Sequence, residues 1–130
     1  MIVHFPVGLL ISGVVFEIYG ALRNDEVAET AGRYNIRFGF WCLFPVLLVG
    51  FLGMISLENT EEFKDFLSSH LTFALCTAGL FFSAMLVSRY LRQPLGRALY
   101  FIIIGVGGIC VLTTGYFGGE LVHRFGVSTH

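Results

Sequence analysis

The sequence predicts an all-α integral membrane protein, a single domain folded as a bundle of four transmembrane helices. Two observations support this fold class. Apolar residues make up 55% of the 130 residues and charged residues only 13%, and the mean hydropathy is +0.78, which lies well outside the balance of a soluble domain. The apolar residues also form four runs, each long enough to cross the ~30 Å hydrocarbon core of a bilayer.

The expected spans begin and end where charged residues appear. They cover residues 5–22, 38–57, 67–88 and 98–122. Pro6 falls in the first turn of the first span, where a helix tolerates proline, and Pro45 predicts a kink in the second. Because the first run lacks a basic flank and a small-residue cleavage site, we expect a retained span rather than a signal peptide.

Polar segments connect the expected spans. Residues 23–37 contain both acids and arginines and predict a solvated loop with at most a short helical turn. Residues 58–66 predict an acidic loop, after which Ser68 or Ser69 can cap the third span. Residues 89–97 predict a basic turn that contains a proline and a glycine.

The loops also predict the orientation of the chain in the membrane. Each span reverses the side on which the chain emerges, so the amino terminus, the 58–66 loop and the carboxyl tail share one side. This side carries Lys64 and Arg124, whereas the opposite side carries Arg23, Arg33, Arg37, Arg89, Arg92 and Arg97. Because Lys and Arg accumulate on the cytoplasmic side, we expect both termini outside the cell (inner) membrane.

Three histidines fall at the extracytoplasmic edge of this topology. His4 opens the first span, His70 opens the third and His123 closes the fourth. Two imidazoles from facing helices can hold a haem iron in a bundle. Zinc or copper would also accept the three histidines, with Glu120 as a further partner. Met54 is a possible replacement axial ligand, although apolar packing is its expected role.

Small residues line one face of the fourth span. The stripe comprises Gly105, Gly108, Gly115 and Gly119. Such a face either packs closely against another helix or admits a flat ligand. Gly118 and Gly119, next to Glu120, form the outer end of this face. Close packing against another helix is the more common role of such a face, and a planar cofactor would enter at this outer end.

The remaining polar or reactive groups predict structural roles. Glu17 is an acid within a span, which is costly and marks a candidate functional residue. It lies about 20 Å along the helix from His4, so we expect it to pair with Arg33 or Arg37 rather than take up protons. Three cysteines without CxxC spacing indicate buried thiols rather than a zinc or covalent haem site; they are Cys42, Cys76 and Cys110.

The two ends of the chain also carry a family resemblance. Val3-His4-Phe5-Pro6, the histidine that opens the third span, and Gly118-Gly119-Glu120-Leu121-Val122 followed by Gly126-Val127 resemble the four-helix membrane family catalogued as domain of unknown function 2231. Members occur joined to Rieske or cytochrome c domains, which implies membrane electron transfer. Many members have Tyr at the position of His123 and His at that of Phe125, so the ligand role carries over to His4 and His70 and less directly to His123.

With this resemblance, the histidine edge predicts a small b-type cytochrome. His4 and His70 would be the axial ligands of haem b, while His123 and Glu120 would orient a ligand or meet the haem propionates. We expect an electron carrier or complex subunit rather than a stand-alone enzyme. Its expected partners are the lipid bilayer, an extracytoplasmic cytochrome c or Rieske protein, and further subunits or copies, but no nucleic acid. The alternatives are a cofactor-free structural subunit and a transition-metal protein for transport or sensing.

Overall fold

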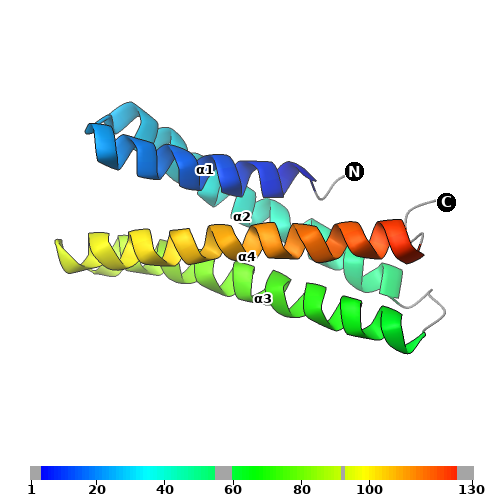
Figure 1. The fold of residues 1–130 in the computed structure, drawn as a ribbon. Helices are drawn as coiled ribbons and strands as arrows, with labels where there is room; N and C mark the ends of the chain where they lie inside the picture. The colour runs from blue at the N-terminus through cyan, green and yellow to red at the C-terminus, as the bar shows by residue number, and fades with distance from the viewer. Residues whose placement is uncertain (1–3, 55–59, 92, 126–130) are drawn as a thin grey trace.

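The computed structural model describes residues 4–54, 60–91 and 93–125, without the side chains of 52–54 and 125. In these ranges the chain forms four helices that lie side by side (Figure 1); they are α1 (His4–Arg23), α2 (Glu26–Met54), α3 (Glu61–Tyr90) and α4 (Leu95–Phe125). All four are long and apolar enough to cross a membrane. The predicted all-α, four-span fold is therefore confirmed.

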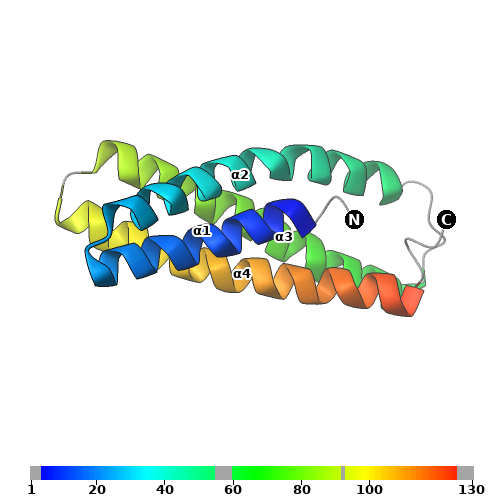
Figure 2. The ribbon, with the colours of Figure 1, turned by 90° about the horizontal axis from the view of Figure 1, so that it is seen from above.

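The helices form two hairpins that pack against each other. Helix α1 packs along α2, and α3 packs along α4. The two hairpins are in contact through α1 with α4 and through α2 with α3. Helices α1 and α3 are therefore diagonal in the bundle (Figure 2), and their backbones do not approach closely in the described part of the chain. Fully buried apolar side chains from all four helices fill the interface; they include Leu10, Ile36, Phe81 and Ile104.

Glycines allow α1 and α2, the two helices of the first hairpin, to pack closely. A Cβ atom at Gly13 would lie 2.7 Å from Ile36 Cγ1, and one at Gly32 would lie 2.7 Å from the Glu17 nitrogen and 2.8 Å from the Gly13 oxygen. Small residues permit such close backbone approach between membrane helices. The sequence pointed to a small-residue face on the fourth span, whereas the closest helix packing joins α1 and α2.

The prediction of a loop at residues 23–37 is wrong. Helix α1 ends at Arg23 and α2 begins at Glu26, so only two residues separate them. Asn24 makes the turn with a φ of 54°, which Asn tolerates better than most residues. The Asp25 carboxylate then accepts hydrogen bonds from the Val27 and Ala28 amides. This cap, together with acids in the first turn, favours a helix where charge alone suggested a loop.

The third helix also begins earlier than predicted. Residues 61–66 of the expected acidic loop belong to α3, which Thr60 caps by accepting a hydrogen bond from the Phe63 amide. Ser68 and Ser69 lie inside the helix and do not cap it. His70 is consequently in the third turn of α3 rather than the first. The predicted turn between the third and fourth spans is confirmed, since α3 ends at Tyr90 and α4 begins at Leu95.

Helices α1 and α4 run antiparallel (Figure 1). They are in contact near the middle of each helix, where Val14 lies 3.6 Å from the Cβ position of Gly108. On one side of this contact lie Glu17 and Tyr100, at what we call the charged end. On the other side, His4 precedes Val14 by ten residues and Gly118 follows Gly108 by ten. Ten residues rise about 15 Å, so His4 and Gly118 share one level at the histidine end.

Candidate functional site

His70 is the most constrained of the three predicted ligands. It projects from α3 toward α4, with Nδ1 3.0 Å from the carbonyl oxygen of Thr114. Its ring covers Gly118, where a Cβ atom would lie 3.2 Å from the His70 Cε1 atom. Because a carbonyl only accepts, Nδ1 carries the proton, and in the neutral ring Nε2 keeps a free lone pair. Metal-binding histidines are commonly oriented in this way.

His4 and His123 are both exposed. His4 precedes Val14 by ten residues, which turns its side chain about a quarter-turn from the side of α1 that contacts α4. His123 lies in the last turn of α4. The three imidazoles therefore occupy one end of the bundle without converging. Among the described residues, no group of three or more His, Cys, Asp or Glu side chains could hold a metal ion.

The glycines of α4 differ in what surrounds them. Gly118 accommodates the His70 ring, so the space expected there for a cofactor is taken by an imidazole. Gly115 and Gly119 instead have no described atom within 4 Å of their Cβ positions. Gly115 follows Gly108 by seven residues and so lies on the same side of α4, the side toward α1. Gly105 is equally open on the other side of Gly108, toward the charged end. The open part at Gly115 and Gly119 is near the level of His4.

Glu120 belongs to an ion-pair network at the end of α4. Its carboxylate accepts a hydrogen bond from Arg124 Nε, and Arg124 also lies 3.6 Å from the Glu62 carboxylate of α3 and over the Phe66 ring. This network joins the end of α4 to the start of α3. Met54, the predicted substitute ligand, has its side chain outside the described residues.

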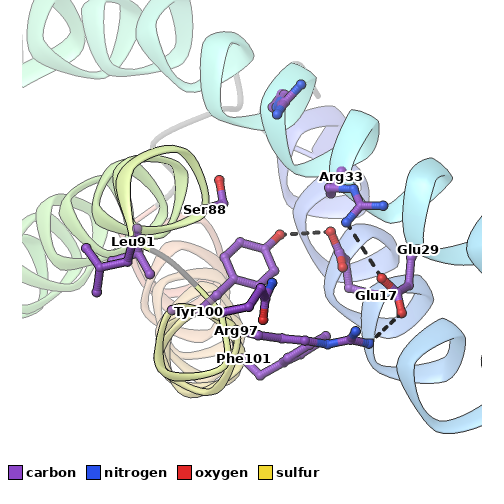
Figure 3. A pocket seen from close by; sticks show the side chains of 12 residues that line it. Glu17, Glu29, Arg33, Ser88, Leu91, Arg97, Tyr100 and Phe101 are labelled. Carbon is purple, nitrogen blue, oxygen red and sulfur yellow. Dashed lines mark hydrogen bonds and ion pairs between the residues drawn. The ribbon is translucent and has the colours of Figure 1, made fainter.

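The charged end holds a buried acid whose partner the sequence does not predict. Glu17 is only 1% exposed, and the Tyr100 hydroxyl donates a 2.8 Å hydrogen bond to its Oε1 (Figure 3). In the described part of the chain no arginine lies within ion-pairing distance of Glu17, so the expected pairing with Arg33 or Arg37 is wrong. The sequence feature that could have identified Tyr100 as the partner is its polar hydroxyl group, which lies in an apolar span at the level of Glu17.

The nearby arginines pair with a different acid. Arg97 lies 2.8 Å and Arg33 lies 3.6 Å from the carboxylate of Glu29 (Figure 3). Next to these groups is a cavity of about 170 Å³ between the hairpins. Residues from all four helices line it; they include Glu17, Glu29, Arg33, Arg37, Ser88, Arg97 and Tyr100. Most of the buried polar chemistry of the described residues is therefore at this end.

Four long apolar helices with a polar cluster between them define an integral membrane protein. A family model described as "Predicted membrane protein (DUF2231)" matches residues 1–130, and the chain belongs to this family. The predicted resemblance is thereby confirmed, although Val3 and Gly126-Val127, which contributed to it, lie outside the described residues. No curated protein and no solved structure matches the chain. The family description gives a membrane location and names no activity.

Proposed function

We propose that this protein is an electron-transfer subunit of the cell membrane that binds haem b at the histidine end. The contact between His70 Nδ1 and the Thr114 carbonyl is the observation that carries this proposal. It holds the ring in a defined orientation, and Nε2 would be available to hold a haem iron. No other histidine in the described part of the chain has a hydrogen bond that orients its ring.

The surrounding residues fit a flat, largely apolar group. Gly115 and Gly119 leave the side of α4 toward α1 open near the level of His4. His4 is exposed at the first residue of α1, and its imidazole would hold the haem iron together with that of His70. Phe117 stacks on Phe73 with ring centroids 5.7 Å apart, which supplies an aromatic wall between α3 and α4.

The bound haem would supply one-electron chemistry, and the residues of the chain would hold and tune it. The Thr114 carbonyl would hold the ring of a His70 ligand in a fixed orientation through Nδ1. At the rim, His123 is exposed, and Arg124 is a better partner for haem propionates than Glu120, because its guanidinium is positive and bidentate. An extracytoplasmic cytochrome c or Rieske protein would exchange electrons with this edge.

An absorption spectrum of the purified protein, produced with ample haem, tests the proposal. We expect a sharp reduced-minus-oxidised band typical of a six-coordinate haem. Replacing either His70 or His4 with Ala should convert the iron to high spin or release the haem, whereas His123→Ala should have a smaller effect. A haem content that none of the three changes alters would contradict the assignment of the site.

A second candidate function is a cofactor-free subunit that docks a partner helix. Leu112 lies on the small-residue side of α4, between Gly108 and Gly115, and is 62% exposed, so this side is free for another membrane helix. A colourless preparation with full haem supply would favour this function. Metal analysis of the same sample would test the transition-metal alternative, for which the described residues offer no three-ligand group.

The extracytoplasmic location of the site is tested by cysteine labelling. In a variant without the native cysteines, Glu61→Cys at the start of α3 should react with a membrane-impermeant reagent in intact cells. Gln93→Cys in the opposite turn should react only after permeabilisation, because arginines flank that side. The reverse pattern would place the histidine end in the cytoplasm and exclude an extracytoplasmic redox partner.

A further inference from the structure

Glu17 is a buried acid that the proposed haem site does not use. It lies about 20 Å along α1 from His4 and is nearly inaccessible, at 1% exposure, yet it lines the cavity at the charged end. Acids in membrane spans are costly and are retained where they have a function. We propose that Glu17 is a proton-binding site that exchanges protons with water in this cavity.

The cavity is large and polar enough to hold water. Its volume of about 170 Å³ far exceeds the ~10–15 Å³ that a cavity needs to hold one water. The lining supplies the hydrogen-bonding groups that buried water needs, since Arg37, Ser88 and Gln93 contribute donors or acceptors beside the acids. A hydrated path therefore reaches Glu17 from the end of the bundle that carries the α3–α4 turn.

The charges around Glu17 leave its carboxyl group free to change protonation state. From α2 it faces Glu29, Arg33 and Arg37, and from α4 it faces Arg97 and Tyr100, while the cavity-lining residues of α3 carry no titratable group. Arg33 and Arg97 are both paired with Glu29. Protonation of Glu17 thus breaks no ion pair, whereas protonation of Glu29 would break two.

The hydrogen bond from Tyr100 determines which oxygen binds the proton. The Tyr100 hydroxyl donates to Oε1, so the proton binds Oε2. A hydronium ion in the cavity transfers its proton to the carboxylate, which yields a carboxylic acid and water, and the reverse step returns the proton to the cavity. Tyr100 acts as a positioning residue, because it keeps its own proton throughout.

The path ends at Glu17 within the described part of the chain. Toward the histidine end, the packing around Val14 and Gly108 closes the way between α1 and α4, and the fully buried Leu10, Phe81 and Ile104 continue this apolar barrier. A proton therefore enters and leaves from the charged end. This arrangement describes a proton-loading site rather than a channel through the bilayer.

Infrared difference spectroscopy on the full-length protein in lipid nanodiscs tests the proposal. When the pH is changed, we expect the carbonyl-stretch band of one protonated carboxyl group to appear and disappear. Glu17→Gln should abolish this band, and Tyr100→Phe should shift its frequency by removing the hydrogen bond to Oε1. Because the exposed acids of the chain also give pH-dependent bands, the Glu17 signal is the difference between the wild-type protein and Glu17→Gln. A wild-type spectrum identical to that of both variants at every pH would overturn the proposal.

Cavity access is tested by deuterium exchange of the same band. Ser88→Leu introduces an apolar side chain into the cavity and should slow the exchange several-fold. Ser83→Leu is the matched control, because Ser83 also lies exposed on α3 with a hydrogen bond to its own helix backbone but does not line the cavity. Equal exchange rates in the two variants would contradict access through the cavity. Neither measurement requires haem, so the haem proposal can fail independently.

Discussion

The charged end and the histidine end satisfy their polar groups in different ways. At the charged end, the buried Glu17 and the partly exposed Glu29 both receive partners from α4, namely Tyr100 and Arg97. At the histidine end, only His70 among the described histidines bonds to another helix. A buried charge without partners costs several kcal/mol, whereas an imidazole at an interface tolerates exposure. Side chains therefore converge where an acid is buried, because the acid needs partners. Side chains that merely share a level along the bundle do not have to converge.

Helix packing should be far less tolerant at the charged end. Gly32→Leu would force a side chain into the backbone of α1, where a Cβ atom already lies 2.7 Å from the Glu17 nitrogen. We expect a loss of about 3 kcal/mol or more, or no folded protein, because overpacking of a close backbone contact cannot relax through side chains alone. Thermal unfolding in detergent measures this loss.

Gly8→Leu is the matched control at the histidine end. The Cβ position of Gly8 has no described atom within 4 Å, so the same substitution should leave the unfolding temperature unchanged or slightly higher, since leucine favours helix more than glycine does. A similar loss in both variants would show that α1 packs as closely near His4 as it does near Glu17.

The number and class of the helices could be predicted from the sequence, but their boundaries could not. Long apolar runs are sufficient to identify membrane spans. The charged residues 26–37, however, belong to α2, because Asp25 caps this helix and Gly13, Gly20 and Gly32 let it pack along α1. Hydropathy reports where lipid surrounds a helix and does not detect a polar helix segment that another helix covers.

The hydrogen bond between Tyr100 and Glu17 should contribute more to stability than any single hydroxyl at the other end. Tyr100→Phe leaves a buried carboxyl group without its donor, and hydrogen bonds to charged groups contribute about 1.5–3 kcal/mol. We expect a destabilisation of about 2 kcal/mol in chemical unfolding. Tyr116→Phe on the same helix should change little, because Tyr116 is 63% exposed. Equal effects would mean that the Tyr100 hydroxyl is hydrated rather than bonded to Glu17.

The candidate site was predictable in its residue types and levels, but not in its contacts. Three histidines at one end follow from the parity of the spans alone. The imidazole of His70 fills the space over Gly118. This contact depends on the rotation of α3 relative to α4, and the sequence does not encode this rotation because the apolar faces of the two helices are closely similar. Likewise, Glu17 was expected to bind an arginine, but Glu29 occupies Arg33 and Arg97.

The His70 contact can be sharpened with two adjacent glycines. Gly118→Ala would place a Cβ atom 3.2 Å from His70 Cε1, whereas Gly119→Ala meets no described atom within 4 Å. Both variants gain up to about 1 kcal/mol of helix propensity, but Gly118→Ala should lose a similar amount because the ring must shift. Chemical unfolding should therefore find Gly119→Ala more stable by about 1 kcal/mol. If the two variants are equally stable, the ring does not lie on Gly118.

The smallest effects are expected for the ion pairs that join helices at the two ends. Arg97 lies 2.8 Å from Glu29, whose side chain is 15% exposed, while Arg124 lies 3.6 Å from Glu62, whose side chain is 65% exposed. Exposed pairs contribute about 0.2–1 kcal/mol and are screened by salt. We expect Arg97→Gln to cost about 1 kcal/mol and Arg124→Gln about half of that.

Salt dependence separates these two pairs more sharply than the size of the effect. High salt should remove most of the difference between the wild-type protein and Arg124→Gln, because water surrounds Glu62. It should leave more of the Arg97→Gln difference, because the side chain of the partner carboxylate is only 15% exposed and also pairs with Arg33. Unfolding curves of both variants at low and high ionic strength measure this contrast. Equal screening at both ends would mean that ions reach Glu29 as freely as Glu62, and the contrast between the charged end and the histidine end would then rest on Glu17 alone.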